Sequence, residues 1–221
     1  MKKGWKYVDF ADLVGYHIEV TRLSYNTHSK EYAESWEWNE KIRKRTKDDY
    51  LEPFVMWLKG KSVLVIGCGT GRDAKLLTHK GFLCLGIDSA QGMLREAVDS
   101  RGVSCPLLCA NFESMDFMDE SFDGVLIDSA LEHIKKADLQ EALEKVKRCL
   151  KKRGVCLIRF RIGTGKVFLV EDAVGERYFT SFTKGETKKI VEKTGMRIVD
   201  EFVRNHLEPS RPGFYTYILR K

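Results

Sequence analysis

Residues 62–73 decide the fold and read Ser-Val-Leu-Val-Ile-Gly-Cys-Gly-Thr-Gly-Arg-Asp. The apolar run from Val63 to Ile66 leads directly into glycines at every second position. A short apolar run bounded by glycines is typical of a strand that is buried on both faces. The glycines allow a tight turn and a close approach of the backbone to a ligand, because they have no Cβ. The stretch therefore predicts a strand, a glycine turn and a helix N-terminus whose free N–H groups face a cofactor.

Downstream of this stretch, apolar runs and helix-forming segments alternate to the end of the chain. Such alternation implies a parallel sheet with right-handed crossovers. The last two apolar runs form a hairpin, so the last strand is expected to be antiparallel. We therefore expect an α/β fold, a Rossmann-like three-layer sandwich around a mostly parallel seven-stranded sheet. The predicted strands are 62–66, 82–88, 103–109, 122–128, 155–161, 196–205 and 214–220, and the predicted helices are 70–80, 90–100 (capped by Ser89), 137–150 and 183–194.

Residues 1–61 are expected to form an N-terminal helical cap. Tyr25, Tyr32 and Trp36 are spaced by seven and four residues, which places them on one face of a helix. These aromatic side chains either pack on the domain or close over a ligand. Residues 48–60 predict a further helix, with Pro53 suited to its first turn.

Two other segments are less regular. Residues 16–21 alternate and predict a short strand or an extended arm. Residues 162–182 form a long connection, which in a compact domain is usually functional, and we expect it to be a lid insertion over the substrate site. The whole chain, residues 1–221, is expected to form one domain, with the core at 62–221.

The composition indicates a protein of the cytoplasm. No apolar stretch approaches the roughly 20 residues that cross a bilayer, and we expect no signal peptide and no membrane partner. The six cysteines include no Cys-x-x-Cys pair, so we expect buried thiols in a reducing compartment and no metal site. The net charge of +6 permits contact with nucleic acid without favouring it. The basic cluster at 41–47 is either a solvated helix face or a patch that binds RNA.

Asp88 ends the second predicted strand, 21 residues after Gly67. A carboxylate at this point can accept hydrogen bonds from both hydroxyls of a ribose. NAD and other adenosine cofactors both meet this description. Arg72 stands where a dinucleotide fingerprint has Gly or Ala, and the chain ends in the expected hairpin with one reversed strand. Both features argue against NAD.

With the segment at 122–134, Phe-Asp-Gly-Val-Leu-Ile-Asp-Ser-Ala-Leu-Glu-His-Ile, the sequence resembles the class I S-adenosylmethionine-dependent methyltransferases of the small-substrate type. Residues 63–73 look like the first motif of the family, 86–94 the second, 109–112 the third and 121–134 the fourth. The order and spacing of these motifs carry the resemblance, which covers roughly residues 25–205.

The resemblance implies that S-adenosylmethionine is the cofactor and gives roles to the matched residues. Asp88 would hold the ribose hydroxyls, Ser89 or Met93 would flank the adenine, and Asn111 with the N–H of Phe112 would face its edge. Ser129 and Ala130 would lie near the transferred methyl group. Asn111 stands where the family usually has Asp, which predicts weaker binding. The remaining residues implied to line the cofactor are Tyr25, Tyr32, Gly67, Cys68, Gly69 and Gly71.

His133 is the candidate general base, and the alternative is that it orients its loop. The connection at 162–182 is bordered by Arg159, Arg161, Arg177 and Tyr178, which either meet an anionic substrate or lie on the surface. The resemblance thus predicts transfer of a methyl group to an O, N or S atom of a small molecule. An RNA methyltransferase and a catalytically silent cofactor-binding scaffold are the alternatives, and the oligomeric state stays open.

Overall fold

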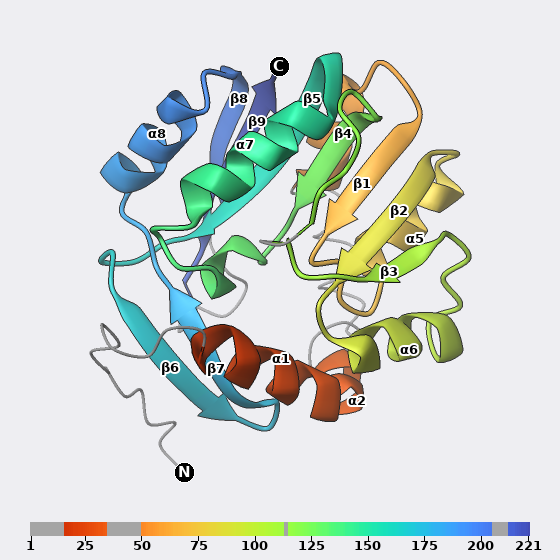
Figure 1. Cartoon of the computed structure of the whole chain (residues 1–221), viewed down its shortest axis with the longest axis vertical. Coiled ribbons are helices and arrows are strands. Elements are labelled where there is room, and N and C mark those ends of the chain that lie inside the picture. The colour runs from red at the N-terminus through yellow and green to blue at the C-terminus, as the bar shows by residue number, and fades with distance from the viewer. Residues whose placement is uncertain (1–15, 35–49, 113–114, 205–211) are drawn as a thin grey trace.

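A seven-stranded sheet forms the centre of the molecule in a computed structural model that describes residues 16–34, 50–112, 115–204 and 212–221 (Figure 1). The strand order is β3-β2-β1-β4-β5-β9-β8. Strands β1 to β5 pair in parallel, and β9 is antiparallel to both β5 and β8. The predicted sheet and its reversed last strand are therefore confirmed. The strands are β1 Ser62–Ile66, β2 Leu83–Asp88, β3 Leu107–Cys109, β4 Phe122–Ile127, β5 Leu150–Arg161, β8 Arg197–Arg204 and β9 Phe214–Arg220.

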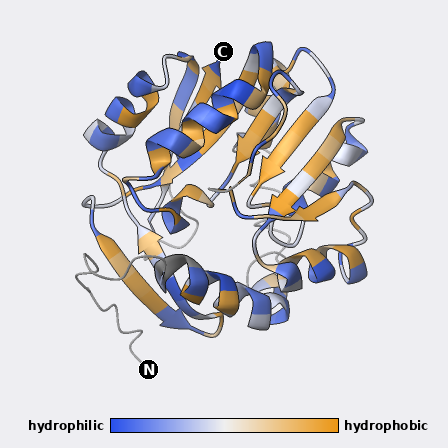
Figure 2. Ribbon diagram, in the orientation of Figure 1, coloured by the Kyte–Doolittle hydropathy of each residue, from blue (hydrophilic) through white to orange (hydrophobic). Residues whose placement is uncertain are grey.

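Helices cover both faces of the sheet, which gives the expected three layers (Figure 1). On β1, Val63 and Val65 join one core cluster and Leu64 and Ile66 join the other. This strand is therefore buried on both faces, as its unbroken apolar run predicts, and the strands are the most hydrophobic part of the ribbon (Figure 2). The helices are α4 Glu52–Trp57 and α5 Arg72–His79 on one face, α7 Leu139–Cys149 and α8 Lys184–Lys193 on the other, and α6 Gln91–Asp99 after β2.

The predicted cap on the helix after β2 is wrong. The N-cap residue of α6 is Ala90, and no side chain caps the helix. The carboxylate of Asp88 instead accepts a hydrogen bond from the Ala90 N–H at 2.9 Å. The hydrogen-bond acceptor at the start of α6 is therefore the carboxylate of Asp88, and not the hydroxyl of Ser89 as we expected.

The strand or extended arm predicted at residues 16–21 is also wrong, because helix α1 spans Tyr16–Thr27. The helix packs on strand β7, Gly175–Thr180, through polar side chains. Thr21 Oγ1 accepts from the N–H of Tyr178 at 3.0 Å, and Ser24 Oγ donates to the carbonyl of Glu176 at 2.5 Å. These contacts use hydroxyl groups and not apolar side chains. The sequence of α1 therefore lacks the regular spacing of apolar residues that usually marks a packed helix.

The connection at 162–182 contains a two-stranded antiparallel hairpin, β6 Val167–Asp172 and β7 Gly175–Thr180. Phe168 and Phe179 stack across it with ring centroids 5.7 Å apart. Gly175 makes the turn with φ of 83°, a conformation that glycine adopts without strain. The hairpin and α1 lie side by side across the end of the sheet to which β1, β2 and β4 point (Figure 1).

The predicted aromatic face is split between two short helices. Tyr25 lies on α1 and Tyr32 ends α2, Ser29–Tyr32, and their rings meet edge to face with centroids 5.5 Å apart. Trp36 and the basic cluster at 41–47 lie outside the described residues. The helix predicted at 48–60 is present as α4, which buries Phe54 completely.

Candidate active site

The glycine turn after β1 has the geometry that its sequence predicts. Gly67, Gly69 and Gly71 have φ of 64°, 54° and 77°, in the left-handed region that disfavours other residues. A Cβ at Gly67 would lie 2.5 Å from the Cβ of Ala130, closer than atoms can approach. The turn is therefore locked against the segment that follows β4.

Asp88 lies at the carboxyl end of β2 and faces this turn. One carboxylate oxygen accepts from the Gly69 N–H at 2.8 Å and the other from the Ala90 N–H. Burial raises the pKa of Asp88, while these N–H groups oppose the rise. Each oxygen keeps a further lone pair, so the carboxylate is fixed and still able to accept a hydroxyl.

The residues predicted around the adenine come from the ends of β2 and β3 and from α6. The N–H of Ala110 donates to the Asp88 carbonyl at 3.0 Å, which brings the end of β3, and with it Asn111, beside β2. Met93 is buried, and its Cε would lie 3.3 Å from a Cβ at Gly69. The side chain of Phe112 packs in the core, and the carbonyl of Ser89 accepts from Cys109 Sγ at 3.7 Å. The buried thiol of Cys68 lies against Gly86 of β2.

A network of acids and arginines, whose pairing the sequence analysis missed, joins the start of α5, the end of β4 and β5. Asp128 follows β4 and accepts from Arg159 at 2.6 Å and from Arg72 at 2.9 Å. Tyr50 Oη lies 2.8 Å from Asp128 and 2.9 Å from Asp73. Burial alone would raise the pKa of Asp128, but Arg159 and Arg72 outweigh it and lower this pKa to about 2. Asp128 is therefore charged and fully engaged.

The backbone after β4 is strained. Ser129 has φ of 56°, which is rare for a residue other than glycine and is often found at functional sites. The turn leads into one turn of 3-10 helix at Leu131–His133. It places Ala130 on the glycine turn, Glu132 beside Arg161 of β5, and His133 against the Tyr178 carbonyl of the hairpin.

His133 is held by both of its ring nitrogens. Nδ1 lies 2.7 Å from the carbonyl of Tyr178, and Nε2 lies 3.0 Å from the hydroxyl of Tyr25. A carbonyl only accepts, so Nδ1 carries the proton and the Tyr25 hydroxyl donates to Nε2. Burial lowers the pKa of His133 to about 3, so the ring is neutral at pH 7.

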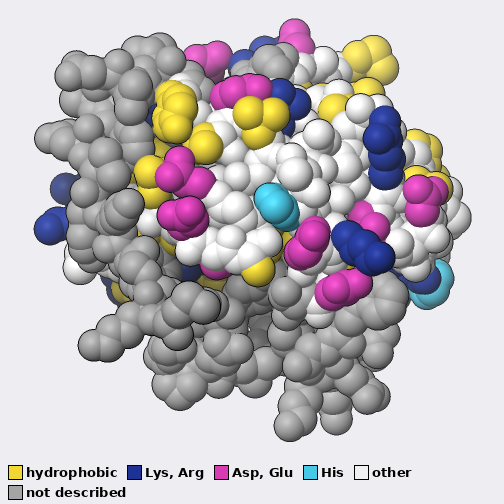
Figure 3. All heavy atoms as spheres, turned by 90° about the horizontal axis from the view of Figure 1, so that it is seen from below, with side chains coloured by type: hydrophobic (Ala, Val, Ile, Leu, Met, Phe, Trp, Pro, Cys, Tyr) yellow, Lys and Arg dark blue, Asp and Glu magenta, His cyan; other side chains and the backbone are white. Residues whose placement is uncertain are grey.

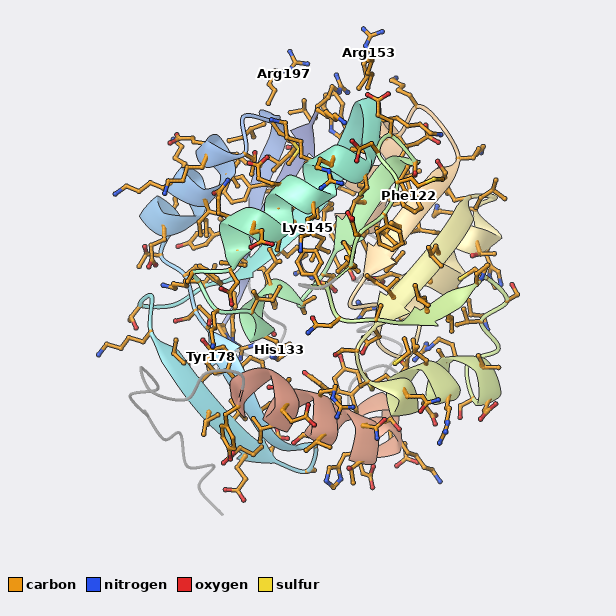
Figure 4. The ribbon with its side chains drawn as sticks, in the orientation of Figure 1. Phe122, His133, Lys145, Arg153, Tyr178 and Arg197 are labelled. Carbon is orange, nitrogen blue, oxygen red and sulfur yellow. The ribbon has the colours of Figure 1, made fainter. Side chains whose placement is uncertain are left out.

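The arginines predicted to meet substrate are all held in ion pairs. Arg159 and Arg177 are buried, and Arg161 is partly buried. Arg177 forms two contacts with Asp172, at 2.6 and 2.7 Å, and lies over the Tyr25 ring at 5.4 Å. Arg161 lies 3.5 Å from a carboxylate oxygen of Glu132 and over the ring of Phe179 at 4.7 Å. The side chain of Tyr178 is buried beside Thr180, and His133 and Tyr178 lie together above α1 (Figure 4).

The surface over this region is mixed in charge. Seen from the side of α1 and the hairpin, its described acidic and basic side chains are interspersed (Figure 3). The part of the chain that the structure describes contains no group of three or more His, Cys, Asp or Glu residues arranged to hold a metal ion. It also contains no helix that is long and apolar enough to cross a membrane.

A sheet of this order, with a glycine turn after its first strand and an acid after its second, defines an α/β domain that binds an adenosine cofactor. The Asp88 carboxylate beside an open-backbone glycine turn fits S-adenosylmethionine. Residues 64–158 match the family model described as a methyltransferase domain. This match agrees with the resemblance of the motifs to the class I S-adenosylmethionine-dependent methyltransferases.

Known relatives and solved structures agree with this assignment. The chain is 29% identical over 143 residues to demethylmenaquinone methyltransferase of Corynebacterium urealyticum, covering 65% of this chain and 54% of that protein. It is 28% identical over 158 residues to ubiquinone biosynthesis O-methyltransferase of Dinoroseobacter shibae, covering 65% and 62%. The chain thus spans a little over half the length of these relatives. The 1,6-didemethyltoxoflavin-N1-methyltransferase structure of Burkholderia thailandensis superposes with a TM-score of 0.74 at 19% identity, covering 100% of this chain and 96% of that one, which supports the fold.

Proposed function

We propose that the protein transfers a methyl group from S-adenosylmethionine to an O, N or S atom of a small-molecule acceptor. The observation that carries this proposal is the Asp88 carboxylate, fixed 2.8 Å from the N–H of Gly69 where a ribose would lie. The sulfonium of the cofactor supplies an activated methyl group. The protein then has to bind, orient and exclude water.

In this proposal the cofactor lies along the glycine turn, with Asp88 on the ribose and Met93 and Asn111 at the adenine. Ser129 and Ala130 lie at the methyl end. We assign His133 a positioning role in preference to that of a general base. Both of its nitrogens are engaged and its pKa is about 3, whereas an effective base has a pKa near the working pH.

A small acceptor is favoured over RNA. Helix α1 and the β6–β7 hairpin lie packed together across the carboxyl end of the sheet (Figure 1), where they can enclose a small molecule. Relatives named for demethylmenaquinone, ubiquinone biosynthesis and didemethyltoxoflavin point the same way. We further propose that the chain forms one domain. All six cysteines are free, which supports a reducing compartment such as the cytoplasm.

Calorimetry with S-adenosylmethionine tests the proposal. The wild type should bind, and Asp88→Ala should weaken binding at least tenfold, because the ribose hydroxyls lose their acceptor. Asp99→Ala, an exposed acid at the end of the neighbouring helix α6, is the matched control and should bind like the wild type. An unchanged dissociation constant for Asp88→Ala would place the cofactor elsewhere.

Turnover separates the enzyme from its alternatives. Release of S-adenosylhomocysteine with small acceptors supports the proposal. Cofactor binding without release across a broad acceptor panel would favour the silent scaffold. Retardation of RNA that falls steeply between two salt concentrations would favour the RNA enzyme.

A further inference from the structure

Glu132 is a buried acid that the proposed chemistry has not yet used. Its residue exposure is 5%, and its Oε2 atom has no hydrogen-bond partner among the described residues. Its other oxygen lies 3.5 Å from Arg161 Nη1, at the limit of a hydrogen bond. Burying a charged oxygen without a hydrogen-bond partner costs free energy, so such an atom, here called an orphan atom, needs an explanation.

Arg161 supplies a matching orphan. Its Nε–H donor is buried and has no hydrogen-bond partner in the described part of the chain. One ion pair therefore leaves one acceptor and one donor unused. A hydroxyl group satisfies both, because its proton donates to Glu132 and its oxygen accepts from Arg161.

The position of Glu132 connects this pair to methyl transfer. Glu132 lies three residues beyond Ser129. The same segment contains Ala130, which packs against Gly67 of the glycine turn. The hydroxyl of Tyr25 is fixed on the adjacent His133, and Phe168 and Phe179 lie under Arg161 at 5.8 and 4.7 Å. The surroundings of the ion pair are thus aromatic and charged.

We infer that Glu132 and Arg161 bind the acceptor through a hydroxyl group on a planar, aromatic or enolic molecule, with Glu132 taking its proton. This inference rests on the proposed function. The O–H bond breaks as its proton passes to Glu132 Oε2. An oxygen electron pair forms the new O–CH3 bond, and the electron pair of the S–CH3 bond stays on sulfur as the thioether of S-adenosylhomocysteine.

The electrostatics of the pair suit this role. Burial raises the pKa of Glu132, while Arg161 opposes the rise. A raised pKa makes the carboxylate a stronger proton acceptor, and the Arg161 guanidinium stabilises the developing charge on oxygen. Both orphan atoms are covered in this structure, so α1 or the hairpin has to move for an acceptor to enter.

The test uses 4-nitrocatechol, a coloured aromatic diol, as the probe. Its binding to the full chain saturated with S-adenosylhomocysteine is measured for the wild type, Glu132→Gln and Asp123→Asn. Asp123 is a lysine-paired acid on the opposite end of β4 and serves as the control. We expect Glu132→Gln to bind the probe at least tenfold more weakly and to methylate it about 100-fold more slowly, with the control unchanged.

Cofactor affinity separates the two possible failures. If the wild type does not bind S-adenosylmethionine, the proposed function fails. If it binds the cofactor but not 4-nitrocatechol, or if Glu132→Gln binds and methylates the probe as the wild type does, this inference alone is overturned. Should Glu132→Gln not fold, Arg161→Lys removes the orphan donor and keeps the charge, and it should weaken probe binding by a similar factor.

Discussion

At the scale of single residues, Asp128 is the most constrained group at the carboxyl end of the sheet. It holds two guanidinium groups, Arg159 and Arg72, inside the protein. Asp128→Asn leaves both cations without a full counter-charge, so we expect a loss of about 3–5 kcal/mol in the free energy of unfolding. Urea unfolding measures this change in the free energy of unfolding. Tyr50→Phe removes only the hydroxyl from the same network and should cost about 1 kcal/mol, and equal losses for the two variants would contradict this account.

The residues of this network also show where sequence reasoning stops. Asp88 could be predicted because it follows an apolar strand at a set distance from the glycine turn. Arg72, Asp128 and Arg159 come from three separate segments, and only the fold brings them together. No local period marks such residues, so their pairing could not be read from the chain.

At the scale of secondary-structure elements, α1 connects two parts of the site. The Asn26 side chain accepts from the N–H of Gly92 on α6 at 2.7 Å, while Thr21 and Ser24 bond to the backbone of β7. A Cβ at Gly92 would lie 2.2 Å from the backbone oxygen of Asn26, so Gly92 permits this contact. The position of α1 is therefore set from both sides.

Gly92→Ala should displace α1 from α6. We expect faster amide exchange in α1 and roughly tenfold weaker binding of S-adenosylmethionine, a loss of about 1.4 kcal/mol. Gly185→Ala on α8 is the matched control, since a Cβ there meets nothing within 4 Å. The control should leave exchange and binding unchanged. Identical exchange of α1 in both variants would show that the helix is held by other contacts.

The secondary-structure elements fall into two groups, those that a local sequence pattern predicts and those that depend on contacts between distant parts of the chain. Strands β1 to β5, β8 and β9 and the helices that follow β1 could be predicted from apolar runs, helix formers and glycine stops, and their bounds shift by at most five residues, at the start of β5. Helix α1 and the hairpin are stabilised chiefly by contacts with each other, more than 150 residues apart in the chain. Their pairing carries no local pattern, which is why the sequence indicated an arm and an irregular connection.

At the scale of the whole molecule, stability should fall in acid. The folded pKa of His133 is about 3 and lies below its unfolded value near 6.5. The unfolded chain therefore binds the proton first, and this contribution to stability is present above pH 6.5 and lost progressively below it. Asp128, with a folded pKa of about 2, loses its contribution below about pH 4.

The raised pKa values of Asp88 and Glu132 act in the opposite direction, so the comparison needs a variant. Between pH 7 and pH 5, the unfolding free energy of the wild type should fall by about 1–2 kcal/mol more than that of His133→Gln. Urea unfolding at the two pH values gives both numbers. Parallel pH dependence in the two proteins would show that His133 does not titrate on unfolding.

The docking of α1 on β7 has a consequence for synthesis of the chain. Ser24 leaves the ribosome long before Glu176, its partner 152 residues later. At about 5–20 residues per second, the nascent helix has to wait roughly 8–30 s for the strand that it packs on. Strands β1 to β5 can assemble while α1 is still unattached. One half of the cover over the candidate site, α1, is thus translated before these strands and is expected to dock after them.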